Sequence, residues 1–172
     1  MATTTTNNGW DIPQSSDYVK QGATAIATLG QDIDTAVGTG LLTWTNYTPT
    51  FTNLTVGNAT INFSYSQLGK TVNVRGYLTF GTTTSVSGLI SISLPVNTAT
   101  TIGGPVIGHA RYNDTGTAAY SGIASVASAS TVACTIANVA ATYPTIINTS
   151  ATIPHTWANL DVLMINLTYV AA

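Results

Sequence analysis

The carboxylates that could do chemistry in this sequence are few and far apart. Hydrolysis of a glycosidic bond needs two carboxylates placed across that bond, and between Trp44 and the C-terminus the chain has only Asp114 and Asp161. Asp114 lies in a run of turn-forming residues, Tyr112 to Gly116, and Asp161 opens a segment with a strand pattern. We therefore expect no catalytic carboxylate pair.

Nucleophilic and metal chemistry have no better support. A serine hydrolase needs a serine on a strained turn with a histidine and an acid in reach, but no Gly-x-Ser-x-Gly occurs, and His109 and His155 are interpreted as structural. Two histidines, one cysteine and scattered aspartates offer no spacing of metal ligands, and Asp32 and Asp34 are expected to be solvated. The sequence predicts a protein without enzymatic activity, catalytic residues, cofactor or metal ion.

Charge is scarce along the whole chain. There are four cationic residues and six aspartates, no glutamate, and a net charge of −2. Four scattered cations cannot form the basic patch that nucleic acid needs, so nucleic acid is excluded as a partner. A surface this poor in charge suggests burial against copies of the chain or a larger assembly. The alternative is that threonine, asparagine and serine keep the surface hydrated.

The composition favours β structure, because threonine, valine and isoleucine are abundant. Cys134 is the single cysteine, so no intrachain disulfide is possible. It lies among small apolar residues in the alternating segment 131–136, which is typical of a strand interior. We expect a buried and unreactive thiol.

The first residues, 1–9, are polar and low in complexity, and we expect them to be extended or disordered unless a partner orders them. They lack the pattern of a signal peptide, and no apolar run could cross a bilayer, so the protein is expected to be made and folded in a cytoplasm without membrane insertion. Trp10, Ile12 and Pro13 then interrupt the polar segment. They are interpreted as an anchor, with the alternative that Trp10 packs on the first turn of a following helix.

A helix is predicted from about Tyr18 to Val37. Residues 15–17 (Ser-Ser-Asp) offer N-cap side chains, and Gly38 and Gly40 mark its end. Apolar residues recur within it at seven-residue spacing, with others at the intervening positions; the predicted seam is Val19, Ile26, Leu29 and Ile33.

The seam needs a partner surface. A helix of about 20 residues is not stable alone in water, and Gly22 and Gly30 weaken this one by about 1 kcal/mol each. The helix must pack on copies of itself or on the β domain. We favour self-association.

From Trp44 onward, short alternating runs are separated by turn residues, and they predict eight strands. The runs are 48–54, 60–66, 71–80, 89–94, 106–112, 118–126, 132–137 and 161–169. This pattern predicts an antiparallel β-sandwich or jelly roll. The predicted division is a tail over residues 1–14, an oligomerisation helix over 15–40 and a β domain over 41–172. The last run is partly apolar on both faces, so both are expected to be covered, inside the sandwich or at a subunit interface.

Several segments carry a resemblance that spans most of the chain. They are Asn8 to Pro13, Ser16 to Ala23, Leu29 to Asp34, Trp44 to Thr50, Leu68 to Val72, Ile92 to Val96 and Ala110 to Gly116. In this order they resemble small virion proteins of tailed bacteriophages, notably those infecting actinobacteria, which are described as minor tail proteins, short fibres or head fibres.

The resemblance implies a segment that docks on the virion, a helix that trimerises and a β domain displayed outward. It leaves open whether the protein sits on the tail or the capsid. The expected function is a non-enzymatic short fibre or decoration protein on the virion surface, with itself and phage tail or capsid proteins as partners. The alternative is a receptor-binding module for host-surface glycan, using exposed aromatics. Its candidates are Tyr112, Tyr120, Tyr143 and Trp157, although we favour a packing role for each of them.

Overall fold

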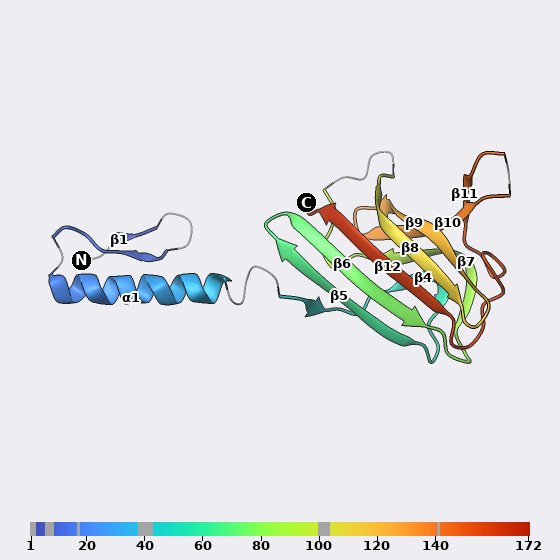
Figure 1. Ribbon diagram of the computed structural model, residues 1–172, viewed down its shortest axis with the longest axis horizontal. Coiled ribbons are helices and arrows are strands. Elements are labelled where there is room, and N and C mark those ends of the chain that lie inside the picture. The colour runs from blue at the N-terminus through green and yellow to red at the C-terminus, as the bar shows by residue number, and fades with distance from the viewer. Residues whose placement is uncertain (1–2, 6–8, 17, 38–42, 100–103, 141) are drawn as a thin grey trace. The chain divides into compact units, whose positions relative to one another are not determined.

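The computed structural model describes residues 3–5, 9–16, 18–37, 43–99, 104–140 and 142–172 (Figure 1). The chain divides into two compact units, Met1–Thr43 and Trp44–Ala172. It is mainly β, with 53% strand and 12% helix. The predicted arrangement of a short N-terminal helix followed by an antiparallel β domain is confirmed.

The N-terminal unit combines a small hairpin and one helix. Strands β1 (Thr3–Thr4) and β2 (Asp11–Ile12) pair antiparallel, and β2 contacts helix α1 (Val19–Thr35). The N-cap residue is Tyr18, whose backbone N–H donates to the Gln21 side chain at 3.3 Å. The cap is thus one residue beyond the predicted 15–17 segment, of which Asp17 lies outside the described residues, as do Gly38 and Gly40.

The predicted seam of α1 separates into two parts. Val19, Ile26 and Ile33 are 92%, 61% and 43% exposed within the single chain. Leu29 is half-buried and follows the buried Ala25 by one helical turn, on the more protected side of the helix. Among the described residues of this unit, the seven-residue series therefore stays exposed to solvent.

The β unit is one antiparallel ten-stranded sheet that contains all eight predicted strands. In chain order its strands are β3 (Thr45–Asn46), β4 (Phe51–Thr55), β5 (Thr60–Leu68), β6 (Thr71–Thr79), β7 (Ser85–Ser93), β8 (Val106–Asp114), β9 (Ala118–Ser128), β10 (Thr131–Asn138), β11 (Thr145–Asn148) and β12 (Val162–Val170). Along the sheet the order is β3-β5-β6-β12-β8-β9-β10-β7-β4, and β11 adds to β10. Strand β12, the last in sequence, therefore lies inside the sheet, between β6 and β8.

The sheet curls into a half-barrel, which brings its two ends together over one core (Figure 1). Phe51 of β4 and Phe63 of β5 come from opposite ends of the strand order, yet their rings meet edge to face with centroids 6.0 Å apart. Fully buried Tyr112 donates its hydroxyl to the carbonyl of Thr135 at 3.0 Å. Gly122 makes this possible, because a Cβ there would collide with that carbonyl and with the Tyr112 ring. Alternating side chains of every long strand thus build the core.

No described helix is long and apolar enough to cross a membrane.

Candidate functional site

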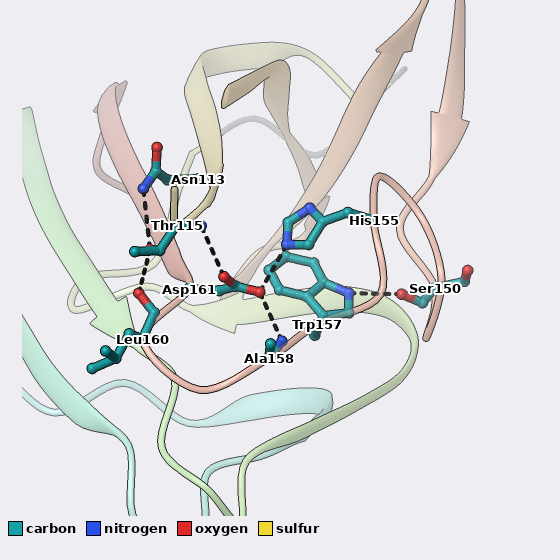
Figure 2. A network of polar contacts seen from close by, with 8 residues as sticks. All are labelled: Asn113, Thr115, Ser150, His155, Trp157, Ala158, Leu160 and Asp161. Carbon is teal, nitrogen blue, oxygen red and sulfur yellow. Dashed lines mark hydrogen bonds and ion pairs between the residues drawn. The ribbon is translucent and has the colours of Figure 1, made fainter. Parts of the chain in front are cut away.

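Asp161 meets His155 beside the turn between β8 and β9 (Figure 2), and the carboxylate of Asp114 lies close to both. Asp161, just before β12, is only 2% exposed. Its two oxygens accept hydrogen bonds from the backbone N–H of Ala158 at 2.7 Å, the backbone N–H of Thr115 at 3.0 Å and Nε2 of His155 at 3.1 Å. One buried carboxylate therefore holds the β8–β9 turn, the segment before β12 and the His155 ring together.

The same cluster is the best candidate for a cation among the described residues. Ligand atoms of Asp114, His155 and Asp161 lie within 4.8 Å of one another. Both oxygens of Asp161 are, however, already occupied by N–H groups, which present positive ends where a cation would sit. A buried carboxylate that accepts three hydrogen bonds from separate segments stabilises a loop junction, and we assign it that role.

The His155 ring is fixed by stacking as well as by Asp161. It stacks on Tyr120 with ring centroids 5.5 Å apart and is tilted against Trp157 at 4.7 Å. Its Nδ1 is buried without a hydrogen-bond partner among the described residues. The ring contacts and the bond to Asp161 thus fix the orientation of His155 within the loop junction.

The four aromatic residues predicted for glycan contact lie in different surroundings. Tyr112 is a core residue, and Trp157 stacks on Phe80 at 4.6 Å while donating Nε1–H to the Ser150 carbonyl at 2.9 Å. Tyr120 is half-buried against His155, and only Tyr143 is largely exposed. The packing interpretation therefore holds for Tyr112 and Trp157.

Polar side chains gather instead on the outer face of β3, β5, β6, β12 and β8. Strand register sets them in two rows across the sheet. The first row is Asn46, Ser64, Arg75, Asn166 and His109, and the second is Asn62, Tyr77, Met164 and Arg111. These nine residues, together with Trp44, define what we call the outer groove.

The outer groove forms an open pocket of about 600 Å³. A second hollow of about 340 Å³ shares Asn46 and Asn62 with it, so the concave surface extends along the sheet edge. Trp44 and Tyr77 are 39% and 41% exposed and present aromatic surface to solvent. The size and the mixed aromatic and polar lining are those of a small-ligand site.

The electrostatics of the outer groove are one-sided. Arg75, Arg111 and His109 line it, and none of its lining residues is acidic. The Arg75 guanidinium lies 4.1 Å from the centroid of the Trp44 ring, a cation–π contact, and its Nε is 3.4 Å from the Ser64 hydroxyl. Among the described residues neither arginine is paired with a carboxylate. The groove is therefore a site of positive potential.

The sequence did not predict this groove. The polar face of 71–80 was visible as an alternation, but only strand register brings Arg75 beside Asn166 and His109. The outer face of β12, expected to be covered, is exposed at Met164 and Val170 within the single chain.

The predicted anchor residues belong to the N-terminal unit. Trp10 and Pro13 are half-buried and Ile12 is exposed. The backbone N–H of Trp10 donates to the Thr5 hydroxyl at 2.9 Å, which fixes Trp10 at the hairpin turn. Their role in attachment stays a prediction.

Comparison with protein-family models, curated proteins and solved structures found no significant match to this chain.

Proposed function

We propose that this chain is a non-enzymatic structural protein of a tailed-phage virion, a short homotrimeric fibre or decoration protein. It would attach to the tail or capsid through residues 1–14 and display its β unit outward. The observation that carries the proposal is the exposed apolar series on α1. Val19, Ile26 and Ile33 recur at heptad spacing and remain in solvent in the single chain.

Copies of the same chain are the occupant that fits this series best. A strict seven-residue repeat suits another helix with the same repeat, because each apolar side chain then enters a hole of the facing helix. A helix of 17 residues gains most of its stability from such packing. The low charge of the chain supports the same conclusion, since few charges would be buried on assembly.

Attachment through the N-terminus rests on the exposed Ile12 and the half-buried Trp10 and Pro13 beside it. Apolar groups at the start of a chain, on a small hairpin, suit docking into a pocket of a larger particle. The virion and the mounting point follow from the sequence resemblance alone.

Two matched double variants test the helical seam. Ile26→Asp with Ile33→Asp places charges in the exposed apolar series, and we expect the native mass to fall to that of one chain. Thr24→Asp with Gln31→Asp adds the same two charges at exposed positions outside the seven-residue series and should leave the native mass unchanged. An unchanged mass in the first variant would overturn the seam.

A second candidate function is recognition of host-surface glycan by the β unit. The outer groove favours it, because exposed Trp44 and Tyr77 stand beside amide and hydroxyl side chains in a concave surface. The two functions are compatible, since a displayed fibre domain can also bind a receptor. A screen of the purified protein against immobilised glycans tests this candidate.

A further inference from the structure

We infer that the outer groove binds an acidic saccharide, with Arg75 and Arg111 pairing with its carboxylate or sulfate groups and Trp44 and Tyr77 packing on its sugar rings. This inference rests on the glycan-recognition candidate above and adds the charge of the ligand and the residues that read it.

The distribution of charge is the first argument. The β unit has three cationic side chains besides its histidines, Lys70, Arg75 and Arg111, and two of the three line the groove. The two aspartates of the unit are elsewhere, Asp161 buried and Asp114 half-buried. Like charges gathered on one face repel unless an anion lies between them. The groove is therefore complementary to an acidic ligand.

The geometry of the arginines is the second argument. Arg75 on β6 and Arg111 on β8 are separated by β12, and they pair with residues of β12 that are two positions apart. At ordinary strand spacing this places their Cα atoms about 12 Å apart. Two acidic groups on one short oligosaccharide can bridge that separation. Arg75 is already oriented by the Trp44 ring and the Ser64 hydroxyl, so little side-chain entropy is lost when its guanidinium binds a carboxylate.

The neutral part of the lining suits sugar hydroxyls. Asn46, Asn62 and Asn166 provide amide donors and acceptors in both rows. Asn62 already contacts the Tyr77 hydroxyl at 3.4 Å, which holds that ring at the groove surface. Saccharides present alternating hydroxyl edges and C–H faces, and this lining offers a partner for each.

Other occupants fit less well. The β unit of a second copy of this chain cannot neutralise the arginines, because its exposed surface is nearly free of carboxylates. A nucleic acid strand needs more phosphate contacts than two arginines and a histidine supply. An acidic saccharide satisfies both the charges and the amides.

The test is a calorimetric titration of the full chain with two pairs of hexasaccharides. The first pair is hexagalacturonate and its fully methyl-esterified form, and the second is sulfated and unsulfated maltohexaose. We expect the acidic member of at least one pair to bind, and its neutral counterpart to bind at least about tenfold more weakly. The pair whose acidic member binds shows whether the groove recognises carboxylate or sulfate groups.

Single variants then locate the binding surface. Arg75→Gln and Arg111→Gln should each weaken acidic binding roughly tenfold or more. Lys70→Gln removes the same charge from the β5–β6 turn outside the groove and should leave binding unchanged. These side chains are exposed, and an unaltered thermal melt of each variant confirms that it folds.

The remaining outcomes overturn the inference in distinguishable ways. Equal binding of acidic and neutral saccharides, unaffected by either arginine variant, would leave glycan recognition standing and remove the acidic specificity. Equal weakening by Lys70→Gln and Arg75→Gln would show diffuse attraction without a groove. No binding in either pair at millimolar concentration would overturn the inference, and the screen against immobilised glycans would then decide the glycan candidate separately.

Discussion

Nε2 of His155 lies 3.1 Å from a carboxylate oxygen of buried Asp161, and the other oxygen of Asp161 binds the backbone N–H of Thr115, 46 residues earlier in the chain. The carboxylate also receives two backbone N–H groups, from Thr115 and Ala158. Removal of a buried acceptor with three donors strongly lowers the stability of the fold, because each donor loses its partner and remains shielded from water.

Asp161→Asn should therefore lower the free energy of unfolding by about 2–4 kcal/mol, since the new amide turns N–H groups toward donors. Urea denaturation followed by circular dichroism measures the change. Asp114→Asn is the control, because Asp114 is only half-buried, and it should change stability by less than about 0.5 kcal/mol. Equal effects of the two variants would contradict the assigned junction.

Leu160→Gly should stabilise the protein. Leu160 has φ of 73°, a left-handed conformation that is costly for a branched side chain, and it is 57% exposed, so little burial is lost. After the entropy cost of glycine in the unfolded chain, we expect a net gain of about 0.5–1 kcal/mol. Leu68→Gly removes a leucine of 52% exposure from a strand and should instead destabilise. Thermal melts of both variants measure whether the melting temperature rises for Leu160→Gly and falls for Leu68→Gly.

The Cys134 thiol should be unreactive in the folded protein. It is fully buried, and burial raises its pKa to about 12, so almost no thiolate exists at neutral pH. A disulfide reagent at pH 8 should label the native protein only as it unfolds and should label it fully in denaturant. Thr71→Cys in a Cys134→Ala background places a thiol at an exposed strand end and should react within minutes. Fast labelling of native Cys134 would contradict the core assignment.

Stability should fall in alkaline solution. Burial raises the pKa of Cys134 from 9.0 to about 12 and also raises the pKa of Tyr112. Between pH 9 and about pH 12 the unfolded chain loses the Cys134 proton that the folded chain keeps, so the free energy of unfolding decreases as pH rises. Cys134 alone contributes a slope of about 1.4 kcal/mol per pH unit above pH 9. Denaturation between pH 7 and 11 measures it, and Cys134→Ala should show a shallower slope.

The eight long strands were predictable because each alternates apolar and polar residues over several positions. The alternation of 71–80, for example, places Val74 and Leu78 in the core and Arg75 and Tyr77 outside. The hairpin of β1 and β2 was not predicted, and two short strands of the β unit were also missed. β3 has only two residues, and β11 is a four-residue segment without a buried face.

The sites could not be predicted because they depend on register between distant strands. Arg75 and His109 flank the same Asn166 only because β12 inserts between β6 and β8. The cluster of Asp114, His155 and Asp161 likewise forms where the β8–β9 turn meets the segment before β12. The spacing of residues within a single segment predicts neither arrangement.

The native mass of the purified full chain, measured by light scattering after size exclusion, tests the central claim most directly. The exposed heptad series on α1 predicts self-association, and the trimer implied by the sequence resemblance would have three times the 17.7 kDa of the single chain. A mass of 17.7 kDa over the micromolar range would contradict the fibre assignment and leave the apolar series without the partner that we propose.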